Sequence, residues 1–214
     1  MSSRYLAEFF TLALVHFLAV VSPGPDFAIT VKQSILYGRN TAIITSIGIG
    51  IGISIHVFYT LIGLSFIVSS SPLFFEGSKI IGAAYLTYLA ISLLKSEGKV
   101  DSNLNSNLVQ KIKTPSARSA LWTGILTNAT NPKATLFFLS IFTVIISRET
   151  PLPIQIGYGV WMCTVNALWF ILVSLFFSHE KVRGKFLKFG HWFERGMGVI
   201  LLGLAAKLAF TTIK

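Results

Sequence analysis

Residues 22–26 read Ser-Pro-Gly-Pro-Asp in the middle of an apolar segment that runs from about residue 5 to residue 31. Proline removes a backbone donor and clashes with the preceding helical turn, so this stretch predicts a break in an otherwise continuous helix. An aspartate at membrane depth costs about 2.5 to 3.5 kcal/mol even on lenient insertion scales. We therefore expect the function of the protein to lie at this break.

The composition indicates the class of protein to which this segment belongs. Hydrophobic residues make up 53% of the 214 residues, charged residues only 12%, and the mean hydropathy is +0.70. Such a chain cannot bury its apolar surface in a water-soluble globule, so we predict an all-α integral membrane protein. Six apolar runs are long enough to be transmembrane helices, at about residues 5–31, 41–70, 78–94, 119–147, 154–177 and 196–211.

The 18 basic residues exceed the 8 acidic ones, and their distribution predicts an orientation in the membrane. They gather after the first apolar run, between the third and fourth runs, and between the fifth and sixth runs. Because Lys and Arg are enriched in cytoplasmic loops, both termini are predicted to lie outside. No basic stretch alternates with aromatic residues or carries a nucleic-acid-binding module, so the expected partner is the lipid bilayer and not nucleic acid.

A polar segment at residues 95–118, rich in Ser, Asn and Lys, divides the chain. We interpret it as a cytoplasmic linker between two three-helix repeats, 1–94 and 119–214, of a single transporter domain. Three crossings in each repeat would insert the second in the opposite orientation. Each repeat has its first helix interrupted, at 22–26 and at 128–133, where the sequence reads Asn-Ala-Thr-Asn-Pro-Lys. Paired interruptions predict a transport site between inverted repeats; purely structural proline kinks are the alternative.

Two charged residues lie deep in the interrupted runs, Asp26 in the first and Lys133 in the fourth. We expect Asp26 to bind a substrate ammonium, a transported proton, or both in turn; its alternative role is to cap the following helix. Lys133 would pair with Asp26 or with a substrate carboxylate, and its alternative role is a structural salt bridge. The remaining candidates for binding or coupling are Ser22, Asn128 and Asn131, the other helix-break residues are Pro23, Gly24, Pro25 and Pro132, and His16 and His56 are secondary candidates.

Glycines recur at a four-residue interval in the second apolar run. Gly48 and Gly52 are overlapped there by Ser46, Gly50 and Ser54. Small residues at this interval allow helix backbones to approach closely, so we expect a tight seam either with the first helix or across a dimer.

The motifs of the common enzyme classes are absent from the sequence. It contains no Walker loop, no His-Glu-x-x-His, no Gly-x-Ser-x-Gly and no dinucleotide-binding glycine motif, so we do not expect an enzyme. Cys163 is the single cysteine, and we expect neither a metal site nor a cofactor. A passive channel is a further alternative, which would need a pore lined by rings of polar residues.

Several motifs occur together in an order that resembles one family. They are residues 22–27, Tyr37-Gly38-Arg39, the glycine-rich second run, 124–128, and Asn131-Pro132-Lys133-Ala134 followed by Phe137-Phe138. Over essentially the whole chain they resemble the LysE/RhtB amino-acid exporters, and within them the threonine and homoserine efflux branch. The resemblance implies a six-helix protein of the bacterial cytoplasmic (inner) membrane that exports an amino acid against inward proton flow, often as a homodimer.

The charges near the breaks bear on the substrate. Asp26 is the only deep residue available to receive positive charge, which favours a neutral amino acid over a cationic one. The Asn, Ser and Thr residues around the breaks suit a small hydroxylated side chain such as that of threonine or homoserine. Another amino acid or small metabolite is the alternative.

Overall fold

The computed structural model describes residues 2–70, 72–95, 113–147, 149–179, 192, 195–203 and 205–206. All regular secondary structure in these ranges is helical, as predicted. The predicted linker lies mostly at 96–112 and the last apolar run continues beyond 206, and both of these stretches fall outside the described residues. The helices are α1 (Ser2–Val21), α2 (Pro25–Tyr37), α3 (Arg39–Ser70), α4 (Pro72–Leu94), α5 (Ala117–Ala129), α6 (Pro132–Val144) and α7 (Leu152–Phe177), followed by helical residues at 195–203 and 205–206.

Two helices are interrupted where the prolines predict. The first break separates α1 from α2 at residues 22–24, and the second separates α5 from α6 at residues 130–131. Gly24 and Asn131 are the N-caps of α2 and α6. In both helices a proline takes the first position, where its missing N–H is not needed for a helical hydrogen bond.

The second half of the first broken helix is longer than predicted. The apolar run ends near residue 31, but α2 continues through Lys32, Gln33 and Ser34 to Tyr37. Gln33 and Ser34 are buried against the rest of the protein, so the polar residues extend the helix and do not end it. The helix stops at Gly38, whose φ of 83° lies in the left-handed region that favours glycine.

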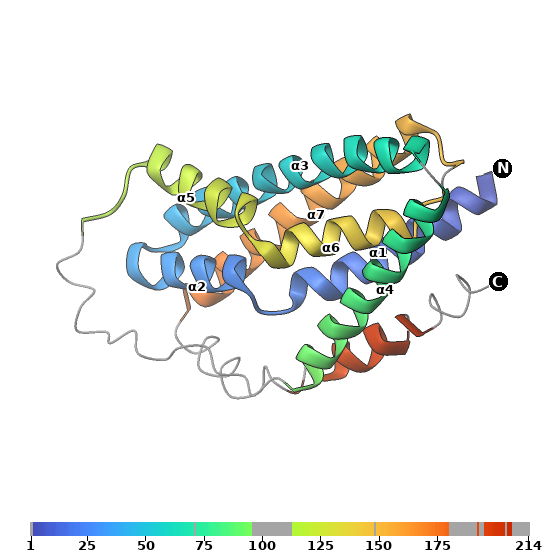
Figure 1. The fold of residues 1–214 in the computed structure, drawn as a ribbon. Coiled ribbons are helices and arrows are strands. Elements are labelled where there is room, and N and C mark those ends of the chain that lie inside the picture. Colours follow the sequence, from blue (N-terminus) through green and yellow to red (C-terminus); the bar gives the residue numbers. More distant parts are fainter. Residues whose placement is uncertain are drawn as a thin grey trace.

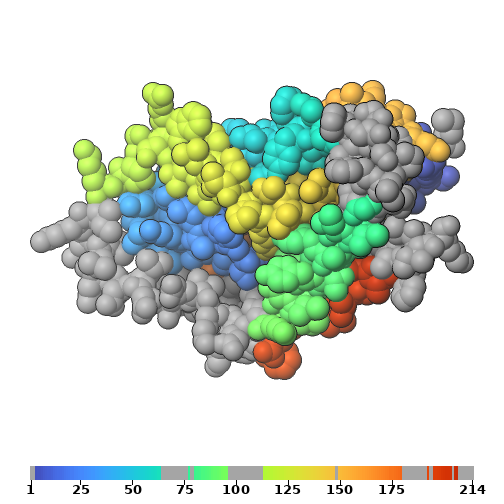
Figure 2. Space-filling view, in the orientation of Figure 1, coloured from blue at the N-terminus to red at the C-terminus, as the bar shows by residue number. Residues whose placement is uncertain are grey.

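The helices form an elongated bundle in which the two broken helices run in opposite directions (Figure 1). The chain passes along the bundle through α1 and α2, and returns in the reverse direction through α5 and α6. The long helices α3 and α7 are likewise antiparallel, and α4 lies beside the helical residues after 195. Helix α3 is central, because it contacts α2, α4, α5, α6 and α7. On the face shown in Figure 2 the surfaces of α2, α5 and α6 adjoin.

Apolar side chains are found both in the interior and on the outside of the bundle. Leu12, Phe138 and Met162 are fully buried, whereas Phe10 and Phe58 are each 66% exposed. An apolar exterior is what a protein surrounded by lipid requires. Within the described residues, three helical segments are long and apolar enough to cross a membrane by themselves, Ser3–Val21, Arg39–Gly63 and Leu152–Phe177, and the apolar helices Ile80–Leu94 and Pro132–Val144 are shorter.

The glycine seam of the second apolar run is formed within the chain. A Cβ atom on Gly48 would clash with the carbonyl of Leu121, and one on Gly124 would clash with the carbonyl of Thr45. Gly52 likewise leaves no room for a Cβ beside Asn128. The seam therefore joins α3 to α5, and the prediction that it joins the first helix or a second copy is wrong. The reason is that Gly124 supplies a complementary small residue on α5.

Candidate functional site

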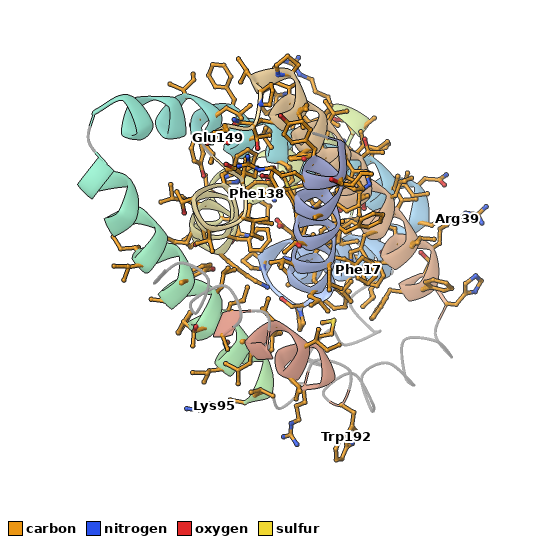
Figure 3. The ribbon with its side chains drawn as sticks, turned by 90° about the vertical axis from the view of Figure 1, so that its right-hand side faces the viewer. Phe17, Arg39, Lys95, Phe138, Glu149 and Trp192 are labelled. Carbon is orange, nitrogen blue, oxygen red and sulfur yellow. The ribbon has the colours of Figure 1, made fainter. Side chains whose placement is uncertain are left out.

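The two helix breaks face each other and border one cavity inside the bundle. Its polar lining comes from both breaks and from α1 and α7, while aromatic side chains form much of its apolar wall. Figure 3 looks from the end where α1 begins and shows the wall residue Phe138 among the helices, whereas Lys95 and Trp192 lie at the edge of the molecule. The polar lining residues are His16, Ser22, Asp26, Asn131, Lys133 and Asn166.

Asp26 lies in the first turn of α2 and reaches across to the second break. Its Oδ2 atom accepts hydrogen bonds from the side-chain amides of Asn128, at 2.9 Å, and Asn131, at 3.2 Å. Its Oδ1 atom is buried and has no hydrogen-bond partner among the described residues. The N-cap of α2 is Gly24, without any side-chain hydrogen bond, so the expectation that Asp26 caps this helix is wrong. Asp26 is the second helical residue, two positions past the N-cap from which a side chain accepts the first-turn amides.

Lys133 lies in the first turn of α6 and reaches in the opposite direction, to the first break. Its Nζ atom donates hydrogen bonds to the carbonyl oxygens of Ser22, at 3.3 Å, and Pro23, at 3.4 Å, and also to the Ser22 hydroxyl. These carbonyls follow the C-terminal end of α1, where partial negative charge accumulates and favours a cation. Lys133 and Asp26 line the same cavity, and their charges interact.

The second break is also held by His56 of α3. The His56 Nε2 atom lies 2.8 Å from the carbonyl oxygen of Asn128, and Nδ1 lies 2.6 Å from the Tyr59 hydroxyl. A carbonyl oxygen can only accept, so Nε2 carries a proton, and in the neutral imidazole Nδ1 then accepts from Tyr59. The ring also stacks on Phe138 with centroids 5.7 Å apart. His56 therefore positions the residue whose amide binds Asp26.

His16 lies apart from this hydrogen-bond network. It is completely buried on α1 between the rings of Phe137, Phe138 and Trp161, with ring centroids 5.6 to 6.1 Å away. Neither of its ring nitrogens has a hydrogen-bond partner within the described part of the chain. It nevertheless lines the cavity.

Asn166 is a candidate that the sequence analysis missed. It comes from α7, is 4% exposed and lines the cavity. Its Oδ1 atom has no hydrogen-bond partner among the residues that the structure describes. The available signal was a single Asn inside the apolar run at 154–177, because polar residues within membrane helices usually face the bundle interior.

The structure thus brings together the five principal candidates, which are Asp26, Lys133, Asn128, Asn131 and Ser22. Each charged side chain is bound by groups of the opposite break. The arrangement presents a carboxylate oxygen and an ammonium group to one cavity, and these are complementary to a molecule that carries both an ammonium and a carboxylate.

Comparison with known proteins gives the same family that the sequence motifs resemble. Residues 17–212 match the family model described as LysE type translocator. A threonine efflux protein of Salmonella typhi is 28% identical over 95% of this chain and 98% of its own length, and a threonine efflux protein of Escherichia coli (strain K12) is 26% identical over 95% and 98%. The uncharacterized membrane protein YrhP of Bacillus subtilis (strain 168) is 27% identical over 89% and 92%. No solved structure matches. Because the family model covers most of its length, the chain belongs to the LysE type translocator family.

Proposed function

We propose that this protein is a secondary exporter of a small neutral amino acid, of the threonine or homoserine kind, that works by proton antiport across the bacterial cytoplasmic membrane. The observation that carries the proposal is the reciprocal contact of the two breaks, in which Asp26 binds the second break and Lys133 binds the first. Family membership and the names of the threonine efflux relatives support the same conclusion.

Substrate binding would use the two charges of the amino-acid backbone. The substrate ammonium would approach the Oδ1 atom of Asp26, which is buried without a partner among the described residues. The substrate carboxylate would pair with the Lys133 ammonium, which is bound to Ser22 and Pro23 in this structure. Charge-assisted hydrogen bonds of this kind are about twice as strong as neutral ones. The two charged ends of the ligand would therefore link the two breaks.

Antiport would follow from the double use of Asp26. A carboxylate that binds either a proton or a substrate ammonium makes the two cargoes compete for one group. The site would release the amino acid when a proton arrives from outside, and it would release that proton when the next amino acid binds from the cytoplasm. Asn128 and Asn131 donate to Oδ2, which leaves Oδ1 as the atom that exchanges its partner.

Access to the site would require the bundle to open. The cavity has a volume of about 40 Å³, and one water molecule needs roughly 10 to 15 Å³ by the same measure. It therefore has room for a few waters and would have to widen to admit an amino acid. We propose that the repeats 1–94 and 119–214 are inverted and move against each other, since their elements run in opposite directions (Figure 1).

The orientation is part of the proposal. The basic loops would face the cytoplasm, which places the linker at 95–118 inside and both termini outside. A reporter fused after residue 105 is expected in the cytoplasm, and one fused after Lys214 is expected outside. The reverse pattern would overturn the orientation and leave the site geometry unchanged.

The test of function is uptake of labelled threonine into inside-out proteoliposomes with an acidic interior. In these vesicles export becomes uptake, and protons leaving the interior would drive accumulation. We expect accumulation that a protonophore abolishes, with competition by homoserine and serine and none by lysine. Equilibration without accumulation would indicate a passive channel. Accumulation that unlabelled leucine or another metabolite prevents, while homoserine does not, would reassign the substrate.

A further inference from the structure

Two buried polar side chains line the cavity away from the charged contacts of the helix breaks. His16 is 0% exposed, and both of its ring nitrogens lack a hydrogen-bond partner among the described residues. Asn166 is 4% exposed, and its Oδ1 atom also lacks one. The two come from α1 and α7, which contact each other.

Buried polar atoms without partners are rare in native proteins and require an explanation. Thr60 Oγ1 and Trp169 Nε1 are also buried and find no hydrogen-bond partner in the part of the chain that the structure describes, but neither residue lines the cavity. His16 and Asn166 differ from them because they border a space in which a ligand can satisfy them. The surrounding wall includes the rings of Phe137 and Phe170, which offer no competing hydrogen bonds.

We propose that His16 and Asn166 form the subsite for the substrate side chain and select amino acids that carry a side-chain hydroxyl. A neutral imidazole has one donor and one acceptor, and the Asn166 oxygen accepts. A hydroxyl donates one hydrogen bond and accepts another, so it can donate to Asn166 Oδ1 and accept from the His16 N–H. An apolar side chain of the same size would leave all of these atoms unsatisfied. This inference rests on the proposed function, because it assumes that an amino acid binds at the two breaks.

Charged side chains fit this subsite poorly. A second ammonium would find no second acidic group, because Asp26, which would bind the ammonium of the substrate backbone, is the only acidic residue among the described residues that line the cavity. A second carboxylate could accept one hydrogen bond from the His16 N–H, but it would face the Asn166 oxygen, which cannot donate to it, and its charge would be buried without a cationic partner. The subsite therefore distinguishes hydroxylated side chains from apolar and charged ones.

The test uses threonine and valine, which differ by a hydroxyl in place of a methyl group. The ratio of their transport efficiencies (kcat/KM) is measured in proteoliposomes for the wild type, Asn166→Leu and His16→Leu. We expect each substitution to lower the threonine-to-valine ratio by roughly tenfold or more, because a site built to bind a hydroxyl loses that preference with its partner. His16→Gln keeps a donor and an acceptor and should retain part of the preference.

Matched controls come from buried polar atoms outside the cavity. Thr60→Val and Trp169→Phe each remove a buried polar atom that has no hydrogen-bond partner among the described residues and does not line the cavity, and they should leave the ratio unchanged. A ratio that Asn166→Leu and His16→Leu leave at the wild-type value would overturn the subsite while amino-acid export stands. Equal transport of threonine and valine by the wild type would also overturn the subsite while amino-acid export stands. A wild-type protein that transports no amino acid would remove the proposed function and the subsite together.

Discussion

The two helix breaks share one pattern and carry opposite charges. In each, an N-cap residue is followed by a proline at the first helical position and a charged residue at the second: Gly24-Pro25-Asp26 in α2 and Asn131-Pro132-Lys133 in α6. The local surroundings do not favour the two charges equally. A helix N-terminus stabilises a carboxylate and disfavours an ammonium, so Asp26 suits its own helix and Lys133 does not.

The caps of the two breaks differ as well. Gly24 offers no side chain to α2, whereas the Asn131 Oδ1 atom accepts from the backbone amide of Lys133 at 3.0 Å. The same Asn131 side chain donates to Asp26 through its amide nitrogen. The second break therefore supports its own helix and the carboxylate of the first. The first break supports Lys133 through the carbonyls of Ser22 and Pro23. This difference indicates that Lys133 stabilises the opposite break, to whose carbonyls it donates, and does not stabilise its own helix.

The largest effect is expected from Asp26→Asn. This change keeps a side chain of the same size but removes the group that would bind a proton or a substrate ammonium. We expect proton-driven accumulation of threonine in proteoliposomes to be lost, a fall of at least a hundredfold, while the folded protein remains in the membrane. Monodispersity in detergent serves as the control for folding. Wild-type accumulation by this variant would refute coupling through Asp26.

Lys133→Met should have the next largest effect, mainly on substrate affinity. A hydrogen bond to a charged group contributes about 1.5 to 3 kcal/mol, so loss of a carboxylate partner should raise KM roughly ten- to hundredfold. Thermal stability should fall moderately, because the carbonyls of Ser22 and Pro23 lose a donor while the substitution also removes an ammonium from an unfavourable helix N-terminus.

A control lysine exists on the other broken helix. Lys32 of α2 is exposed and does not line the cavity, so Lys32→Met should leave KM unchanged. An unaltered KM in Lys133→Met, together with a large loss of thermal stability, would instead show that Lys133 has only a structural role.

The breaks could be predicted from the sequence because their signals are local. Each break combines a proline with a charged residue inside an apolar run, and this combination can be recognised within five residues of sequence. It identified Asp26 and Lys133 before any contact was known. Asn128 and Asn131 followed because they belong to the same short motif. The sequence predicted a site between the breaks, but it could not predict which groups contact each other there, since that depends on how α2, α5 and α6 rotate and pack against one another.

The missed features depend on packing between distant parts of the chain. Asn166 is the single asparagine in a long apolar helix, and the sequence does not indicate which side of α7 faces the cavity. The glycines of α3 predicted a close approach but not the partner, which is set by Gly124 on α5. His56 was only a secondary candidate, because the residues around it in the sequence do not indicate that it binds the carbonyl of Asn128.

Asn131→Gly would make the second break resemble the first. At an N-cap, glycine costs only a few tenths of a kcal/mol relative to asparagine, but Asp26 would lose one of its two amide donors. We expect a loss of about 1.5 to 3 kcal/mol in unfolding free energy, and a melting temperature in detergent lower by roughly 3 to 10 °C. A loss no larger than that of the cap would show that Asn128 alone suffices for Asp26.

Gly24→Ser is the converse change, because it gives the first break a side-chain cap like that of the second, and it should have the smallest effect. The φ of Gly24, −168°, is extended backbone that any residue can adopt. A Cβ there would lie 3.5 Å from Cδ and Nζ of Lys133, which are ordinary contacts. A serine hydroxyl can cap α2, so we expect stabilisation by a few tenths of a kcal/mol, about 1 °C in melting temperature. Gly52→Ala is the matched contrast, because its Cβ would lie 2.8 Å from Cβ of Asn128 and 3.0 Å from the carbonyl of Ile125. It should displace the second break and lower the melting temperature by several degrees.

Gly24→Ser could instead lower the melting temperature as much as Gly52→Ala does. That result would mean that another part of the protein approaches Gly24 closely when the cavity changes shape. The first break, whose helix has no side-chain cap, would then be the break that moves.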